Sequence, residues 1–234
     1  MKAMVLAAGR GTRLRPLTDA RPKALVEVGG RTLLEHVLRR LGAAGVTEVI
    51  INLHHLGAQI PPFLERHRNF GLERVAFSDE PLLLGTGGGL KQAAAFFDDG
   101  RPFLLHNVDV LSDIDLRALL AVHRRNHALA TLAVMDRPTE RPLLFDGDGR
   151  LVGRRTADAG DVVVRGARGG ITALGFCGIQ ALSTAFLERI TEAGAFPITE
   201  PYLRLAGTGA AINGCRVDGA RWRDCGRPED LRPL

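Results

Sequence analysis

The sequence has few cysteines, few aromatic residues and no long apolar run. Its three cysteines, Cys177, Cys215 and Cys225, show no C-x-x-C spacing, so neither a disulfide framework nor a zinc site is expected. Charges or glycines interrupt every apolar stretch before it reaches the roughly 20 residues that a membrane-spanning helix needs. The chain is therefore expected to be cytoplasmic, with reduced thiols and no membrane partner.

Clustered positive charge is also missing. The formal net charge is +5, but the basic residues are scattered along the chain and are not interleaved with aromatics, so nucleic acid is not an expected partner. A hydrophobic share of 45% and a charged share of 24% are typical of a soluble globular domain. We predict a single domain over residues 1–234. The protein is expected to be a monomer or a small homo-oligomer. Its local basic patches suit a phosphate-rich small substrate.

Short apolar runs alternate with helical patterns in the first half of the sequence, which is typical of β-α-β units around a parallel sheet. Strands are predicted over residues 3–7, 49–53, 74–78, 102–106 and 130–135, and helices over residues 33–44, 61–67, 89–97 and 116–127. In the first helix the apolar side chains recur on one face, so Arg39 and Arg40 are expected to face water.

The second half contains more turn-forming residues. A hairpin is predicted over residues 143–152, strands over 173–180, 211–217 and 221–224, and helices over 182–192 and 199–206. The glycine-rich segment 158–170 is predicted to be the most mobile loop. The two halves together predict the α/β class, a three-layer α/β/α sandwich around a mainly parallel, Rossmann-like sheet whose binding loops follow the carboxyl ends of strands.

A loop of small and basic residues follows the first predicted strand. Residues 6–18 read L-A-A-G-R-G-T-R-L-R-P-L-T, and Pro22 and Lys23 come shortly afterwards. Small residues let backbone N–H groups approach an anion, and Arg13 and Lys23 add charged donors to phosphate oxygens. The loop suits a nucleoside triphosphate, although an ordinary glycine turn with surface arginines would read the same as an isolated fragment.

The complete run resembles the signature of the sugar-1-phosphate nucleotidyltransferase family, L-A-G/A-G-x-G-T-R-L-x-P-L-T followed by P-K-P-L or P-K-A-L. The resemblance implies a GT-A-like fold of the nucleotide-diphospho-sugar transferase type and a Mg²⁺-dependent enzyme. It also implies that the loop wraps the nucleotide. The residues that it assigns to nucleotide binding are Ala8, Gly9, Gly11, Thr12, Arg13 and Lys23.

Two carboxylates that lie far apart in the sequence complete the implied site. An apolar strand leads into His-Asn-Val-Asp and ends at Asp109, a position well suited to a hard cation beside a phosphate loop. Family members end this strand in N-G-D or G-D, so Val108 replaces the usual glycine, and residues 222–231 resemble the family's W-x-D-x-G-T-P-E-x-L. The resemblance implies Asp109 and Asp224 as Mg²⁺ ligands. The catalytic and substrate-binding residues that it implies are Arg13, Lys23, Asp109, Asn107 and Gly175.

Residues 85–90, G-T-G-G-G-L, follow a predicted strand. Their glycines would let a base or ribose approach closely, and a helix N-terminus favours anions. The segment resembles the branch of the family that contains N-acetylmuramate 1-phosphate uridylyltransferases, as do residues 51–57. This resemblance implies Gly87 and Gly88 as further nucleotide contacts and favours UTP.

One family feature is absent. Many relatives carry a Glu-Lys-Pro triplet after the hairpin for the sugar and its phosphate, whereas residues 151–155 here are L-V-G-R-R. The reaction that the resemblance implies joins a sugar 1-phosphate to a nucleoside triphosphate, with N-acetylmuramate 1-phosphate and UTP as the expected pair and cell-wall recycling as the expected context. The alternatives are GTP, CTP or dTTP with a mannose, heptose or other hexose 1-phosphate, and a non-catalytic nucleotide-binding module. The candidates for the missing cation are Arg154, Arg155, Arg165 and Arg168.

Overall fold

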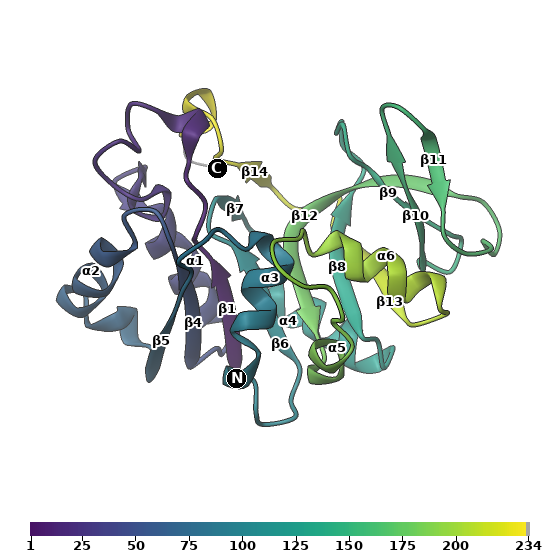
Figure 1. Cartoon of the computed structure of the whole chain (residues 1–234), viewed down its shortest axis with the longest axis horizontal. Coiled ribbons are helices and arrows are strands. Elements are labelled where there is room, and N and C mark those ends of the chain that lie inside the picture. Colours follow the sequence, from purple (N-terminus) through teal and green to yellow (C-terminus); the bar gives the residue numbers. More distant parts are fainter. Residues whose placement is uncertain (233–234) are drawn as a thin grey trace.

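A computed structural model describes residues 1–232 and is built around one large twisted sheet (Figure 1). The strands of this sheet are β1 (Lys2–Leu6), β4 (Glu48–Leu53), β5 (Arg74–Asp79), β6 (Phe103–Asn107), β8 (Ala130–Met135), β9 (Leu143–Phe145), β10 (Leu151–Thr156), β11 (Gly160–Val163), β12 (Thr172–Leu182) and β13 (Ile212–Arg216). Their order is β11-β10-β9-β12-β6-β1-β4-β5, with β8 paired to β12 and to β13.

The first half of the chain forms the parallel part of the sheet. β1 pairs in parallel with both β4 and β6, and β4 pairs in parallel with β5. β12 is antiparallel to β6, β8 and β9, and the β9–β10–β11 meander extends the sheet beyond it. The predicted α/β class is confirmed, and the carboxyl ends of β1, β4 and β6 meet at one edge.

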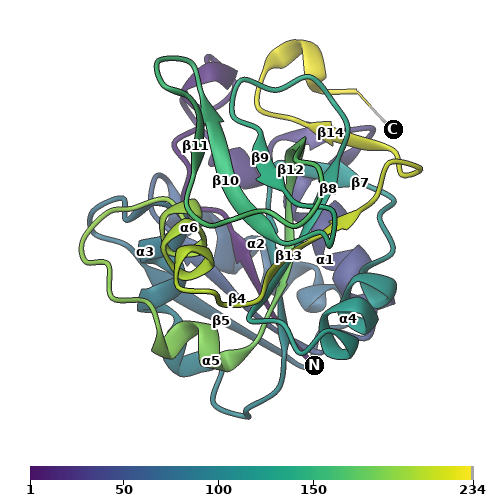
Figure 2. The same cartoon turned by 90° about the vertical axis from the view of Figure 1, so that its right-hand side faces the viewer.

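Helices cover both faces of the sheet, which confirms the three-layer prediction (Figure 2). On one face lie α1 (Leu33–Ala43), α2 (Ile60–Arg66) and α4 (Leu116–Arg125), and on the other lie α3 (Gly85–Gln92), α5 (Thr184–Glu188) and α6 (Thr199–Gly207). Each layer buries its own apolar cluster against the sheet. None of the helices within residues 1–232 has the length and apolar character that crossing a bilayer requires.

Helix α1 shows how the local sequence determines where a helix begins and which face it buries. The Thr32 hydroxyl accepts the N–H of Glu35 at 3.1 Å and so caps the first turn. The apolar face is fully buried, which contributes about 1.5–3 kcal/mol for each large side chain. The prediction that Arg40 faces water is wrong. Its guanidinium donates to the carbonyl of Ile114, and burial lowers the pKa of Arg40.

Three predicted segments differ from the structure. The helix predicted over residues 89–97 begins four residues earlier, because the turn at Gly85, with φ +71°, already directs the chain into α3. The helix predicted over residues 182–192 is reduced to α5, because β12 extends to Leu182. The segment 158–170, predicted to be a loop, contains β11, which pairs with β10 along an antiparallel ladder.

Two small sheets lie beside the main one. β2 (Glu27–Val28) pairs with β3 (Arg31–Thr32) in a hairpin that leads into α1. β7 (Val110–Ser112) pairs with β14 (Trp222–Asp224), so it joins the end of β6 to the C-terminal part of the chain. The sequence did not predict β2, β3 or β7, because two or three residues are too few to show a period.

All three cysteines are free thiols, as the sequence predicts. Burial raises the pKa of Cys177 to about 12 and that of Cys225 to about 11. Because a thiolate is the reactive form of cysteine, these two thiols are unsuited to nucleophilic chemistry.

Candidate active site

The β7–β14 ladder brings the two predicted metal ligands to the same place. Asp224 pairs with Val110, the residue directly after Asp109, and the N–H of Cys225 donates to the Asp109 carbonyl at 2.7 Å. Two residues that are 115 positions apart in the sequence (224 minus 109) therefore lie on neighbouring backbones. This confirms the juxtaposition on which the metal prediction depends.

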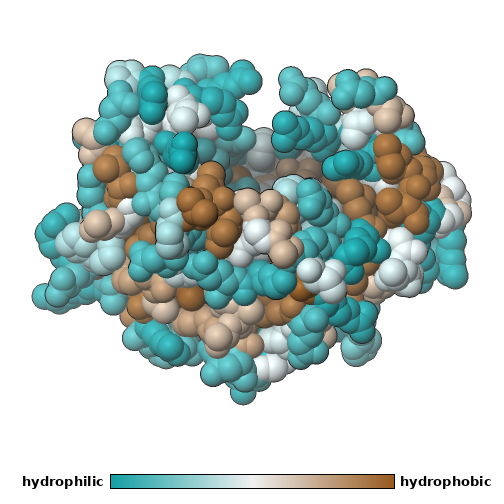
Figure 3. All heavy atoms as spheres, viewed as in Figure 1, coloured by the Kyte–Doolittle hydropathy of each residue, from teal (hydrophilic) through white to brown (hydrophobic). Residues whose placement is uncertain are grey.

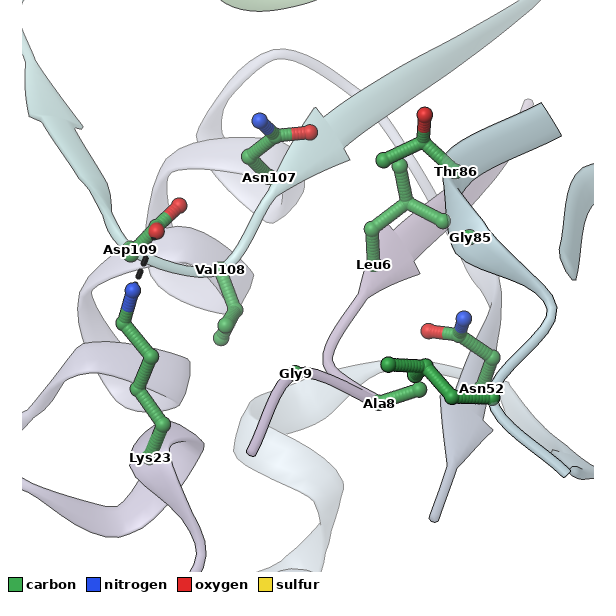
Figure 4. Close-up of a pocket in the computed structure, with 11 residues that line it drawn as sticks. Leu6, Ala8, Gly9, Lys23, Asn52, Gly85, Thr86, Asn107, Val108 and Asp109 are labelled. Atoms are coloured by element: carbon green, nitrogen blue, oxygen red, sulfur yellow. Dashed lines mark hydrogen bonds and ion pairs between the residues drawn. The ribbon is translucent and has the colours of Figure 1, made fainter. Parts of the chain in front are cut away.

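Lys23 forms an ion pair with Asp109 (Figure 4). The lysine lies in a short 3₁₀ turn over Lys23–Leu25 that follows Pro22, and only 7% of it is exposed. An ammonium group in this place is costly to bury unless anions surround it, so the pair with Asp109 explains its position. The ammonium has three donors, and it can hold Asp109 and a phosphate oxygen together.

Asp224 lies in an electrostatically unfavourable position. Its Oδ1 is buried and has no hydrogen-bond partner among residues 1–232. Burial, and then the negative charge of Asp109, raise the pKa of the Asp224 carboxyl. A hard cation would relieve both causes, because it supplies positive charge and a ligand for the free oxygen. The described residues contain no group of three or more His, Cys, Asp and Glu side chains suited to a metal, so the protein would contribute these two carboxylates.

The loop after β1 is held in shape by a hydrogen bond between two of its own residues. Gly11 has φ +63°, and its carbonyl accepts the Thr18 hydroxyl at 2.8 Å. A Cβ at Gly11 would lie 2.8 Å from the Thr18 methyl group, so the turn requires glycine.

The same loop carries Arg13, which is exposed and lies close to Gly226. A Cβ built on Gly226 would be 2.6 Å from a guanidinium nitrogen of Arg13. The loop therefore places Arg13 next to Asp224, where its charge acts on that carboxyl.

A cavity of about 220 Å³ opens beside the Lys23–Asp109 pair. Figure 4 shows Asp109 and Lys23 on one side of it and Thr86 and Asn52 on the other. In the space-filling view the surface is hollowed at the top, between two parts of the molecule (Figure 3). The residues that line the cavity are Leu6, Ala8, Gly9, Lys23, Asn52, Leu83, Gly85, Thr86, Asn107, Val108 and Asp109.

The structure brings some of the predicted site residues to this cavity and places others around it. Five line the wall: Ala8, Gly9, Lys23, Asn107 and Asp109. Val108, the departure from the family pattern, is buried and also lines the wall, and its N–H donates to the Leu6 carbonyl at 3.1 Å. The predicted residues that are not part of the wall are Gly11, Thr12, Arg13, Gly87, Gly88, Gly175 and Asp224.

Sequence reasoning missed the role of a buried polar pair, Asn52 and Glu80, of which Asn52 lines the cavity. Asn52, at the end of β4, accepts the N–H of Ala7 at 2.7 Å and donates to Glu80 at 2.7 Å. The second oxygen of Glu80 accepts the N–H of Leu84 at 2.9 Å. The loop after β1 and the loop before α3 are thus fixed to each other. The available signal was a lone asparagine at the carboxyl end of an apolar strand next to β1.

The glycines of α3 make room for this pair and for a neighbouring loop. A Cβ at Gly89 would lie 2.5 Å from a Glu80 oxygen, and one at Gly87 would lie 2.3 Å from the Phe196 ring. The N–H of Gly87 donates to the Phe196 carbonyl at 3.0 Å, so this donor of the helix N-terminus is already used. A Cβ at Gly88 would lie 2.6 Å from the Gly194 carbonyl oxygen, so packing accounts for glycine at both 87 and 88. The predicted nucleotide contacts of these two residues stay predictions.

The predicted substrate contact Gly175 lies in β12, next to Arg137. A Cβ at Gly175 would be 2.8 Å from the Arg137 side chain. Arg137 donates to the Phe176 carbonyl at 2.8 Å, and its guanidinium carbon lies 4.1 Å from the centre of the Trp222 ring. This arginine therefore connects the end of β8 to both β12 and β14.

The four arginines considered for the missing family lysine have different surroundings. Arg155 donates to both carboxylate oxygens of Asp161, and Arg168 forms an ion pair with Asp148 at 3.7 Å. Within residues 1–232, Arg154 and Arg165 have no ion pair with a carboxylate. Arg154 is exposed on β10, one residue before Arg155 and so on the opposite face of the strand.

Comparisons with known proteins agree with this geometry. Residues 2–145 match the family model described as nucleotidyl transferase. The N-acetylmuramate alpha-1-phosphate uridylyltransferase of Neisseria meningitidis serogroup B is 38% identical over 229 residues, which are 97% of this chain and 93% of that protein. The protein of the same name from Caulobacter vibrioides is 48% identical over 109 residues, which are 46% of this chain and 45% of that protein.

Solved structures show the same fold. A UTP-bound UGPase from Acinetobacter baumannii is 20% identical, has a TM-score of 0.78, and is matched over 98% of this chain and 90% of that chain. A UDP-glucose pyrophosphorylase complexed with UDP-glucose is 17% identical, with a TM-score of 0.78 over 98% of this chain and 95% of that chain. Because the family model covers more than half of the sequence and the Neisseria relative spans nearly all of it, the chain belongs to the nucleotidyl transferase family of enzymes.

Proposed function

We propose that this protein transfers UMP from UTP to N-acetylmuramate 1-phosphate, releasing pyrophosphate, in the cytoplasm and in the recycling of cell-wall sugars. An oxygen of the sugar phosphate forms a new bond to the α-phosphorus of UTP. The bond between that phosphorus and the oxygen leading to the β-phosphorus breaks, and pyrophosphate carries away the electron pair. The observation that carries the proposal is that Asp224 and Arg13 lie beside the Lys23–Asp109 pair, and that this pair lines a cavity.

Mg²⁺ is the cofactor that these residues fit. Asp109 and Asp224 offer carboxylate oxygens, which hard cations prefer, and the unpartnered Oδ1 of Asp224 is free to bind one. When bound there, Mg²⁺ would neutralise charge on the reacting phosphates and act as a Lewis acid.

The chain's own side chains have separate tasks in this proposal. Two anionic phosphates must meet, so alignment and neutralisation are the main requirements. Lys23 is buried beside Asp109 and is positioned to hold the attacking phosphate. Arg13 is exposed within the loop and lies beside Asp224, where it would follow the departing pyrophosphate. Ala8 and Gly9 form a side-chain-poor wall against which the base can lie.

The nucleotide and sugar assignments rest on the relatives. Both uridylyltransferases named above act on N-acetylmuramate 1-phosphate by their names, and one of them is matched along nearly its whole length. A mannose-1-phosphate guanylyltransferase subunit from Dictyostelium discoideum is 35% identical over 135 residues, which are 57% of this chain. The longer match favours UTP and the muramate sugar.

The test is a matrix of Mg²⁺-dependent pyrophosphate release, with each nucleoside triphosphate against a panel of sugar 1-phosphates. N-acetylglucosamine 1-phosphate is the matched control, because it differs from the proposed acceptor only in lacking the lactyl ether. We expect turnover with UTP and N-acetylmuramate 1-phosphate to exceed all other pairs. Preferred turnover of another pair would overturn the substrate assignment, and nucleotide binding without any pyrophosphate release would overturn catalysis itself.

A further inference from the structure

Strand β12 contains a bulge where it passes the end of β6. Residues 176–180 of β12, which make four steps along the strand, lie opposite residues 132–134 of β8, which make two. Gly178 lies inside this bulge with φ +71°, a conformation that suits glycine. A bulge interrupts the ladder and bends the strand, so backbone carbonyls in it need donors from elsewhere.

Two side chains from other parts of the sheet supply these donors. The indole N–H of Trp222, on β14, donates to the Cys177 carbonyl at 2.8 Å. Arg137, two residues after β8, donates to the Phe176 carbonyl at 2.8 Å. The guanidinium carbon of Arg137 also lies 4.1 Å from the centre of the Trp222 ring. The Arg137–Trp222 pair therefore holds the bulge from two sides and is itself held by a cation–π contact.

The bulge lies against a residue of the cavity wall. A Cβ at Gly178 would be 2.8 Å from the amide nitrogen of Asn107 and 3.1 Å from a Val110 methyl group. Asn107 lines the cavity two residues before Asp109 (Figure 4). A shift of the bulge toward β6 would therefore displace the Asn107 amide, which the sequence predicts to contact the substrate.

Trp222 also belongs to the strand that carries Asp224. β14 has three residues, and its ladder to β7 is equally short. Because side chains alternate along a strand, Trp222 and Asp224 lie on the same face of β14. The hydrogen bond from Trp222 to β12 is a further attachment of this short strand, so it helps to fix the backbone that carries Asp224.

We propose that Arg137 and Trp222 are positioning residues for the transfer reaction, and that they fix the Asn107 amide relative to the Asp224 carboxylate. The inference rests on the proposed function, in which these two groups lie on the acceptor and metal sides of one reacting centre. Neither Arg137 nor Trp222 lines the cavity beside Lys23 and Asp109, so both act through the backbone of β12 and β14. Small misplacements of reacting groups cost rate even when binding is retained.

The indole of Trp222 offers a test that needs no turnover. Trp222 is the only tryptophan in the chain, so the ¹⁵N-labelled protein gives a single indole N–H signal in NMR spectra. Arg137→Lys keeps the charge but loses the planar stack, and we expect it to shift this signal and to speed its hydrogen exchange by about tenfold. Arg39→Lys is the matched control, because Arg39 lies over the Phe70 ring at 5.3 Å and far along the chain. An indole signal that Arg137→Lys leaves unchanged would overturn the proposal.

Steady-state kinetics then test positioning, with the best sugar 1-phosphate at saturating nucleotide. Trp222→Phe keeps a ring but removes the N–H, and it keeps the test valid if Arg137→Lys is poorly folded. We expect each variant to lower kcat by about tenfold and to leave the KM for the nucleotide within about twofold. The double variant should be no slower than the slower single variant, because both residues act through one bulge.

Two kinetic outcomes would overturn the proposal. The first is a lower urea midpoint with unchanged kcat, which indicates a structural role alone. The second is a double variant whose loss is the product of the two single losses, which indicates that the residues act independently. If the unsubstituted chain releases no pyrophosphate with any pair of substrates, the proposed function fails, and the positioning role fails with it. The indole signal would then still show whether Arg137 and Trp222 hold the bulge together.

Discussion

On the side of the cleft that we assign to the nucleotide, buried side chains connect loops from several strands, whereas on the side that we assign to the sugar the basic side chains lie on the surface of a meander. Asn52 and Glu80 connect the loop after β1 to the loop before α3, and both are less than 5% exposed. On β10, Arg154 and Arg155 are exposed, and Asp161, the carboxylate that pairs with Arg155, is also exposed.

The difference reflects what each side must recognise. In the proposed reaction the nucleoside triphosphate and its metal have the same requirements whatever the sugar, so their site can be built from long motifs and rigid loops. The sugar differs between relatives, and in this chain the family's Glu-Lys-Pro triplet is replaced by residues whose contacts the motif does not specify. We therefore expect substitutions on the nucleotide side to damage turnover or the fold with any sugar, and substitutions on the sugar side to change only which sugar is used.

The largest expected effect is that of Asp109→Asn. This variant removes a metal-binding charge but keeps an oxygen that can accept a hydrogen bond from the buried Lys23. We expect kcat to fall by about 1,000-fold or more, equivalent to roughly 4 kcal/mol, with every sugar that is a substrate. Asp99→Asn is the control, since Asp99 is exposed and the amide keeps an oxygen that can accept the N–H of Arg101. Turnover close to the unsubstituted rate would show that the carboxylate pair is not the reacting centre.

Asn52→Ala tests the buried pair of Asn52 and Glu80 at the cavity wall. The substitution leaves the Glu80 carboxylate and the Ala7 N–H without their partner, so we expect the free energy of unfolding to fall by about 3 kcal/mol. The KM for the nucleotide should rise, while the KM for the sugar phosphate stays constant. Urea denaturation and steady-state kinetics measure the two effects, with Asn126→Ala, at an exposed position, as the control. A rise confined to the KM for the sugar phosphate would contradict the assignment of Asn52 to the nucleotide side of the cleft.

Gly89→Ala and Gly42→Ala form a matched pair within helices. A Cβ at Gly89 would lie 2.5 Å from the Glu80 carboxylate, whereas one at Gly42 in α1 meets no atom within 4 Å. We expect Gly89→Ala to destabilise the fold by about 2 kcal/mol through overpacking, and Gly42→Ala to stabilise it by about 0.5–1 kcal/mol through helix propensity. Denaturant midpoints measure both. Equal shifts would mean that the G-T-G-G-G segment has no special packing role.

The sequence predicted the parallel part of the fold better than the C-terminal part, for a physical reason. Strands such as β1 are nearly continuous apolar runs, and α1 has a regular apolar face, so the local sequence pattern identifies both. Strand β7 has three residues, and its pairing with β14 depends on a contact across more than 100 positions. No local pattern contains that information.

The candidate site also contains residues that the sequence could predict and residues that it could not. The family motif predicted Lys23, Asp109 and Asp224, and the structure brings them together. It could not predict that Asn52 fixes the loop, because a single polar residue at a strand end has many uses. It also could not choose among the four arginines, since their partners Asp161 and Asp148 are found only from the strand pairing and the turn geometry.

The smallest expected effect concerns Arg154, and it tests the sugar side directly. Arg154 and Arg155 are neighbours on β10 that point to opposite faces, and only Arg155 is held by a carboxylate. An unpaired guanidinium is free to bind an anionic sugar phosphate, so we expect Arg154→Ala to raise the KM for the sugar phosphate by about tenfold, or about 1.4 kcal/mol, without changing the KM for the nucleotide.

Arg155→Ala is the built-in control for that measurement, because it makes the same substitution one residue away and breaks only an exposed ion pair, which is worth about 0–1 kcal/mol. Steady-state kinetics with the sugar phosphate varied at saturating nucleotide separate the two variants. If Arg155→Ala raised the sugar KM and Arg154→Ala did not, the opposite face of β10 would carry the sugar contact. If both variants raised the nucleotide KM instead, β10 would belong to the nucleotide side, and the division between the two sides of the cleft would be wrong.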